Sequence, residues 1–251
     1  MKSNSFVLLL IFCTLTAFAQ QKSQVPAKMV LVPGNDQIKP FYMDQYEVTV
    51  AEFKKFVDAT GYVTEAEKIG GVMRLKSGGV WELVEGGTWM SHASLKKRGY
   101  DVKLYEEPRF MNNPVMSLAP ADVLAYAKWV GKRVPTYEEW VHAAKAGQKN
   151  YPYPYPGGDN LKKVAWYEGN TDSWFPKDVG TKEPNELGIY DLAGGIGELV
   201  IFNKGEKKYG LVGGAFYQSK EWLVIGKVSP APLELNRPSQ GIGFRLVKDV
   251  N

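Results

Sequence analysis

The stretch "PNELGIYDLAGGIGE", from Pro184 to Glu198, ends in a glycine-rich segment with a carboxylate at each end, Asp191 and Glu198. Asp191 and Glu198 lie seven residues apart, and three of the residues between them are glycines. Glycine reaches backbone conformations that aim successive carbonyls at one point, and Ca²⁺ takes about six to eight oxygens in a loose geometry. The stretch therefore fits a calcium loop. The alternative is that Asp191 and Glu198 are surface residues flanking a glycine-rich turn.

Three other segments show helical periodicity together with helix boundary signals. The first and third begin with capping boxes, in which Thr49 pairs with Glu52 and Thr136 pairs with Glu139. Pro120 suits the first turn of the second segment. Since a glycine follows the apolar stripe of each segment, three helices are predicted within residues 49–61, 119–131 and 136–147.

The rest of the chain favours short strands and irregular backbone. Strands are expected within residues 28–34, 78–84, 209–217 and 241–249. Residues 145–187 consist mostly of turn formers and include "YPYPYPGG". No internal repeat or linker divides the chain. The sequence therefore predicts a single α+β domain over residues 20–251, with few helices and much irregular structure.

The first 19 residues have the features of a cleavable signal peptide. Lys2 precedes an apolar run at residues 6–15, and "AFA" at 17–19 predicts cleavage before Gln20. The apolar run is too short to cross a bilayer, so a secreted or periplasmic protein without a membrane span is expected. A lipoprotein acylated at Cys13 is less favoured, because a large phenylalanine precedes that cysteine.

The composition excludes several kinds of site. Cys13 is the only cysteine, so removal of the signal peptide leaves no disulfide, thiolate metal site or cysteine nucleophile. The only histidines, His92 and His142, are too few for a three-histidine zinc site, and they are interpreted as a loop residue and a helix-face residue. The net charge of +4 is spread along the chain, which argues against nucleic acid as a partner. No nucleotide-binding or hydrolase motif occurs.

Several segments, read in order, are together similar to one known family. The two most specific are "GKRVPTYEEW" at 131–140 and the opening stretch at 184–198; the others are "MVLVPG", "FYMDQYEVTVAEFKKFV", "NNPVMSLAPADVLAYAKWV", "VAWYEGNT", "VGGAFY" and "GIGFRLV". They resemble the formylglycine-generating enzyme (sulfatase-modifying factor) family over nearly all of residues 28–248. The resemblance implies a variant of the C-type-lectin-like α+β fold.

The resemblance also implies a loss of chemistry. The family oxidises a cysteine of a sulfatase to formylglycine, using copper held by two cysteines. Their positions are occupied here by Gln218 and Leu223, and Ala215 replaces the serine of a "GGS" motif. Because Cu(I) selects soft sulfur ligands, no copper and no formylglycine formation are expected.

The family pattern "GNxWEW" reads "GGIGEL" in this chain. Gly195 replaces the asparagine, while Gly197 and Leu199 replace the two tryptophans. Since aromatic walls are removed, a surviving cleft is expected to be wider than in the enzymes.

The resemblance assigns a ligand set to the opening stretch. It implies a structural calcium ion held by side-chain oxygens of Asp191 and Glu198 and by the carbonyls of Gly194 and Ile196. Arg133 and Arg245 are typical of the family and are interpreted as structural, because a guanidinium can tie irregular backbone to carboxylates.

Three functional hypotheses follow. The favoured one is an exported, non-catalytic family member, a pseudoenzyme that binds a protein or peptide partner in the family's cleft. The alternatives are an active formylglycine-generating or other metal-dependent oxidase with unrecognised ligands, and a lectin-like or envelope scaffold module. Six aromatic residues are assigned to loop packing in preference to a ligand groove: Tyr151, Tyr153, Tyr155, Trp166, Trp174 and Trp222. The oligomeric state is left open.

Overall fold

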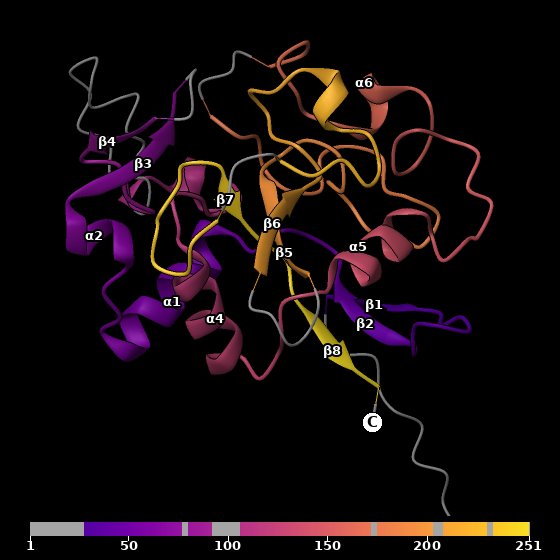
Figure 1. The fold of residues 1–251 in the computed structure, drawn as a ribbon, viewed down its shortest axis with the longest axis horizontal. Coiled ribbons are helices and arrows are strands. Elements are labelled where there is room, and N and C mark those ends of the chain that lie inside the picture. The colour runs from indigo at the N-terminus through magenta and orange to yellow at the C-terminus, as the bar shows by residue number, and fades with distance from the viewer. Residues whose placement is uncertain are drawn as a thin grey trace, which may run out of the picture.

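The protein is represented by a computed structural model, which describes residues 28–76, 80–91, 106–171, 175–202, 208–229 and 233–250. The predicted signal peptide, Cys13, His92 and Trp174 lie outside these ranges. Within them the fold is α+β, with small sheets, few helices and long irregular connections, as the sequence predicts (Figure 1). In this part of the chain, no helix combines the length and the apolar character needed to cross a bilayer.

Two three-stranded sheets and a hairpin make up the β-structure of the described residues. The first sheet has the order β1 (Met29–Val32), β2 (Phe41–Asp44) and β8 (Val247–Asp249), all antiparallel, so it joins the two ends of the described chain. In the second sheet the central strand β5 (Gly197–Phe202) pairs antiparallel with β6 (Lys208–Val212) and parallel with β7 (Ile242–Gly243). The strands β3 (Gly71–Leu75) and β4 (Trp81–Glu85) form the hairpin.

The three predicted helices are confirmed. They are α1 (Val50–Thr60), α4 (Pro120–Trp129) and α5 (Tyr137–Ala144), and the capping boxes of α1 and α5 are both formed. Shorter helices that the sequence did not predict are α2 (Glu65–Ile69) and α6 (Leu161–Val164), with 3₁₀ turns at Pro108–Phe110 and Lys220–Trp222. His142 lies on α5 as expected and is hydrogen-bonded through Nε2 to the carbonyl of Pro33 at 2.7 Å.

Two of the expected strands are shorter or divided. The strand expected at 209–217 ends at Val212, because Gly213 and Gly214 take φ values of 84° and 75° and turn the chain away from the sheet. The strand expected at 241–249 is split into β7 and β8, which belong to different sheets. Arg245 lies in the break, and its side chain is fully buried.

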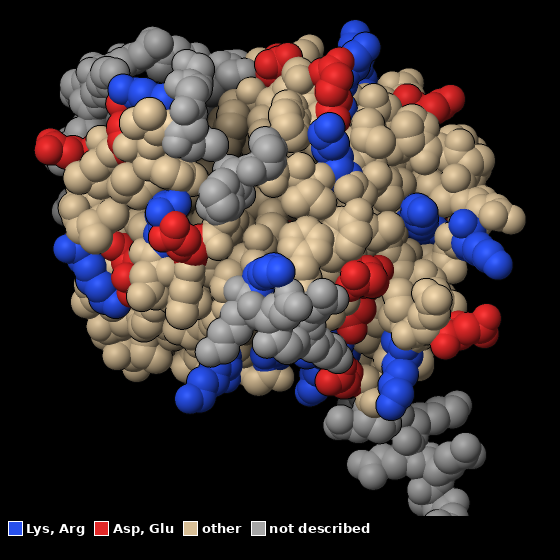
Figure 2. All heavy atoms as spheres, in the orientation of Figure 1, with Lys and Arg blue, Asp and Glu red and all other residues tan. Residues whose placement is uncertain are grey.

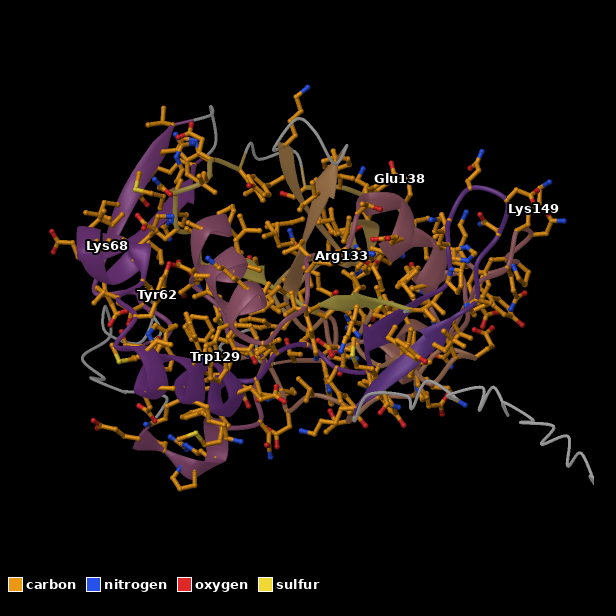
Figure 3. The ribbon with its side chains drawn as sticks, turned by 90° about the horizontal axis from the view of Figure 1, so that it is seen from below. Tyr62, Lys68, Trp129, Arg133, Glu138 and Lys149 are labelled. Carbon is orange, nitrogen blue, oxygen red and sulfur yellow. The ribbon has the colours of Figure 1, made fainter. Side chains whose placement is uncertain are left out.

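The apolar core has two main parts. One lies among α1, α4 and the centre of the second sheet and contains Phe53, Trp89 and Phe244. The other lies between α5 and the first sheet and contains Trp140, Phe41 and Met43. The guanidinium of Arg133, which Figure 3 labels, makes two hydrogen bonds of 2.7 Å to Glu139 of α5. The structural interpretation of Arg133 is therefore confirmed.

Candidate functional site

A buried ion pair connects the two sheets. Arg245 donates from Nε to Glu198 Oε2 at 2.7 Å and from Nη2 to Glu198 Oε1 at 2.8 Å. Trp140 Nε1 donates to the same Oε2 at 2.8 Å. The guanidinium also binds the carbonyls of Asp44, Gln45 and Tyr190. Since both charged side chains are fully buried, Arg245 has the structural role that the sequence predicts, tying irregular backbone to a carboxylate.

Two more carboxylates lie beside this pair. Asp191 has a left-handed backbone, with φ of 58°, and its Oδ2 accepts the backbone N–H of Gly180 at 2.6 Å. Glu47 Oε1 accepts the N–H of Ile196 at 2.8 Å. Asp191 is 5% exposed, Glu47 1% and Glu198 0%. The alternative that Asp191 and Glu198 are surface residues of a turn is therefore wrong.

The pKa values of these groups reflect an excess of buried negative charge. Burial raises the pKa of Glu47 well above its usual range, and the neighbouring charges of Asp191 and Glu198 raise it further. Burial also raises the pKa of Asp191, against the opposing effects of the Gly180 hydrogen bond and Arg245. With three carboxylates against one guanidinium, the centre requires a bound proton or a bound cation, because unpaired buried charge is strongly unfavourable.

The carboxylates retain capacity to bind a cation. Among the described residues, none donates a hydrogen bond to Glu47 Oε2 or to Asp191 Oδ1. The same part of the chain contains no group of three or more His, Cys, Asp or Glu side chains placed to hold a metal ion. A cation here would therefore need backbone carbonyls as well as carboxylates, which the chemistry of Ca²⁺ allows. The set of Asp191, Gly194, Ile196 and Glu198 remains a prediction, with Glu198 already the partner of Arg245.

Glu47 was not predicted from the sequence. The backbone group that it binds lies 149 residues further along the chain, so no local pattern identifies the contact. Its carboxylate lies against the glycine that replaces the family asparagine at position 195. Gly195 has φ of 63°, and an added Cβ would lie 2.5 Å from Glu47 Oε1.

At position 197, where the family pattern has a tryptophan, the structure has no room for a side chain. A Cβ added to Gly197 would lie 2.8 Å from the carbonyl oxygen of Gly241, because β5 and β7 run in parallel contact at this point. The backbone therefore occupies the space that a side chain at position 197 would need. The expectation of a cleft wider than in the enzymes stays a prediction.

The two positions of the family's copper-binding cysteines also differ in their surroundings. Leu223 is 1% exposed and packs in an apolar cluster with Leu161, Val164 and Ala193. Gln218 is half-buried; its backbone N–H binds the carbonyl of Ala215 at 2.9 Å. Position 223 is therefore part of the hydrophobic packing and offers no donor atom to a metal.

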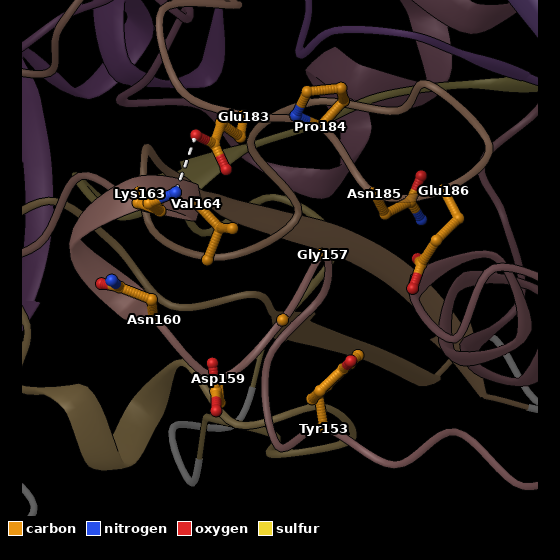
Figure 4. A pocket seen from close by; sticks show the side chains of 11 residues that line it. Tyr153, Gly157, Asp159, Asn160, Lys163, Val164, Glu183, Pro184, Asn185 and Glu186 are labelled. Carbon is orange, nitrogen blue, oxygen red and sulfur yellow. Dashed lines mark ion pairs between the residues drawn. The ribbon is translucent and has the colours of Figure 1, made fainter.

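Two hollows open near these residues, and each involves an aromatic side chain. The first has a volume of about 560 Å³ and is rich in carboxylates, with Glu183 and Glu186 among its lining residues (Figure 4). Lys163 Nζ lies 3.5 Å from Glu183 Oε1 at its edge. Tyr153, which also lines it, is 42% exposed. Trp166 lines the second hollow, of about 570 Å³. Tyr153 also packs edge-to-face on Tyr151, and Tyr155 and Trp222 pack against the cluster around Leu223, as loop packing predicts.

On the face shown in Figure 2, basic and acidic side chains are interspersed and do not gather in a patch of one sign. The fold is that of the C-type-lectin-like α+β class, in its formylglycine-generating enzyme variant. Residues 16–250 match the model of the sulfatase-modifying factor enzyme 1-like domain, and the chain belongs to this family.

Both active and inactive family members are among its relatives. The chain is 30% identical over 200 residues to the formylglycine-generating enzyme of Mus musculus, which covers 71% of this chain and 52% of that protein. It is also 30% identical over 185 residues to the inactive Cα-formylglycine-generating enzyme 2 of Bos taurus, covering 64% of this chain and 59% of the relative. The chain thus spans about half the length of the curated enzymes that it matches first.

Solved structures agree on the fold. The crystal structure of CarF superposes with a TM-score of 0.61 at 20% identity, covering 91% of this chain and all of that one. PvdO from Pseudomonas aeruginosa superposes with a TM-score of 0.60 at 22% identity, covering 85% of this chain and 82% of that one.

Proposed function

We propose that this chain is an exported, non-catalytic member of its family that binds a protein or peptide partner. The observation that carries the proposal is the burial of Leu223, at a copper-ligand position, inside an apolar cluster. Similarity to the inactive enzyme 2 of Bos taurus supports the non-catalytic part. An active oxidase would need a metal centre built from other residues, since Cu(I) prefers sulfur ligands and the only cysteine is Cys13.

Copper binding tests this proposal directly. The purified protein is expected to leave Cu(I) with a competing bicinchoninate chelator, because neither Gln218 nor Leu223 supplies a thiolate. Titration of the coloured chelator complex measures the competition. Removal of one equivalent of Cu(I) per chain, with a melting temperature raised by the metal, would contradict the proposal.

Export is expected to remove the segment that ends at Ala19. The apolar run and the small residues at 17 and 19 are the reason, since signal peptidase requires this arrangement. N-terminal sequencing of the protein from the envelope or the medium should begin at Gln20. A cytoplasmic protein that retains Met1, or lipid attached to Cys13, would show that this part of the proposal is wrong.

A structural calcium ion is the proposed cofactor, because the buried carboxylates of Asp191 and Glu47 belong to an excess of negative charge that a cation would balance. A ligand that binds only the native state at 100 times its Kd adds about 2.7 kcal/mol of stability. We therefore expect a chelator to lower the melting temperature and calcium to restore it. Asp191→Asn should reduce that response, whereas Asp159→Asn, which changes an exposed carboxylate, should leave it intact. Identical melting curves with and without chelator would argue against the ion.

A further inference from the structure

The second hollow has the walls of a binding site for an apolar group. The rings of Phe110 and Phe175 face each other with centroids 4.8 Å apart, and the indole of Trp166 lines the same cavity. The volume of about 570 Å³ lies within the range of roughly 300–1,000 Å³ that ligand sites occupy. An aromatic or large aliphatic side chain would gain from burial against these rings.

Positive charge surrounds the aromatic walls. The guanidinium of Arg109 lies 4.6 Å from the centroid of Phe110, and Lys182 Nζ lies 3.8 Å from that of Trp166. Lys177 also lines the cavity, and Asp178 carries the one carboxylate among the described lining residues. Cations therefore already cover two of the ring faces, and a cationic ligand would be repelled by them. These cationic side chains instead favour a ligand that carries a carboxylate.

Arg109 can exchange its present partner for such a carboxylate. Its Nε lies 2.6 Å from Glu107 Oε2, and the arginine side chain is 70% exposed. Exposed ion pairs of this kind contribute about 0–1 kcal/mol, so replacing Glu107 by a ligand carboxylate costs little.

An amide side chain in the cavity wall is suited to bind a peptide backbone. Asn113 is 4% exposed and donates from Nδ2 to the carbonyl of Pro176 at 2.8 Å. None of the described residues donates a hydrogen bond to its Oδ1. As an amide oxygen, Oδ1 can accept a hydrogen bond from the backbone N–H of a bound peptide.

The cavity wall is held in place by the buried acid centre. Gly180 donates its N–H to Asp191, and Val179 donates to the carbonyl of Asn112 at 3.0 Å. The carbonyl of Trp166 accepts the N–H of Gly195 at 3.1 Å. A wall fixed in this way needs little ordering when a ligand binds, which lowers the entropic cost of binding.

We propose that this cavity binds a peptide segment in which an aromatic or large aliphatic side chain is followed by an acidic residue. The apolar side chain packs against the paired rings of Phe110 and Phe175 and against Trp166, and the carboxylate meets Arg109 and Lys177. The assignment of this cavity rests on the proposed function, which takes the partner to be a peptide. It adds which side chains that peptide must carry.

The test compares three short peptides, capped at both ends, with phenylalanine followed by glutamate, glutamine or lysine. Calorimetry should show the glutamate peptide binding about tenfold more tightly than the glutamine peptide, which corresponds to about 1.4 kcal/mol for a charged hydrogen bond. The lysine peptide should bind most weakly. Arg109→Gln should remove the preference for glutamate, and Phe175→Ala should weaken all three.

Lys163→Gln is the matched control, because it removes one positive charge from the edge of the other hollow. It should leave the order of affinities unchanged, and the melting temperature of each variant shows whether it is folded. Equal affinity for the three peptides, or no effect of Arg109→Gln, would overturn the assignment. If none of the peptides binds while the protein also binds no copper, the cavity assignment fails and the non-catalytic function stands.

Discussion

Replacing Arg245 by methionine is expected to destabilise the protein by about 3–5 kcal/mol, the usual cost of removing one partner of a buried ion pair. The substitution leaves Glu198 buried without its guanidinium, beside the carboxylates of Glu47 and Asp191. It also removes hydrogen bonds to three backbone carbonyls, two of them adjoining β2. Since whole domains have a stability of about 5–15 kcal/mol, the loss should be visible as a large fall in the urea midpoint.

Two further variants make this result specific to the ion pair. The double variant Arg245→Met with Glu198→Gln should recover part of the loss, because it removes the uncompensated charge and keeps an oxygen for Trp140 Nε1. Arg74→Met should change stability by about 1 kcal/mol or less, since that arginine is 52% exposed in its pair with Glu82. If Arg245→Met were no more destabilising than Arg74→Met, the buried pair would not hold the two sheets together.

Local signals in the sequence were sufficient to predict the longer helices. Both α1 and α5 carry a capping box and an apolar stripe, and these lie within one short segment of the chain. The capping box of α2, formed by Thr64 and Glu67, is equally visible in the sequence. It was missed because a five-residue helix is too short to show an apolar periodicity.

Strands whose neighbours are distant in the sequence were harder to predict. All four residues of β2 are buried, so the strand lacks the alternation by which a half-exposed strand is recognised. The division of 241–249 into β7 and β8 depends on where Arg245 finds its carboxylate, 47 residues earlier in the chain. No pattern within the segment carries that information.

The candidate metal centre could likewise be predicted only in part. Asp191 and Glu198 could be selected from the sequence because they flank one glycine-rich stretch. Glu47 and the closure of position 197 depend on contacts between distant segments, with Ile196 and Gly241 respectively. The resemblance to a family therefore identified the positions that had changed, but only the packing shows what replaced them.

The buried acid–arginine centre and the proposed loss of copper chemistry have different physical requirements. The acid–arginine centre joins β5, β2 and the loop at Gly180, so losing it would cost stability whatever the protein does. Gln218 and Leu223, at the positions of the family's copper-binding cysteines, lie outside that network, and Leu223 belongs to an apolar cluster. A chain can therefore lose the catalytic thiols and keep the fold, with the remaining surface available for binding.

No conversion of cysteine to formylglycine is expected when the purified protein is incubated with a sulfatase-type cysteine peptide, Cu(I), oxygen and a reductant. Mass spectrometry of the peptide measures the result. The reaction needs copper held by thiolates, and here Leu223 has no donor atom while Gln218 has only an amide. A family member with both cysteines serves as the positive control under the same conditions.

Restoring the two thiols should not restore the reaction. The double variant Gln218→Cys with Leu223→Cys removes a buried leucine from the cluster with Leu161 and Val164, at a cost on the order of 2 kcal/mol. It can bind Cu(I) through the new thiolates, but the substrate side of the site remains altered. Gly197 has no room for a side chain against the carbonyl of Gly241, and Glu47 fills the space beside Gly195. Copper binding without turnover by the double variant would therefore locate the loss of activity in the pocket as well as in the ligands, whereas turnover by the unmodified protein would overturn the non-catalytic function.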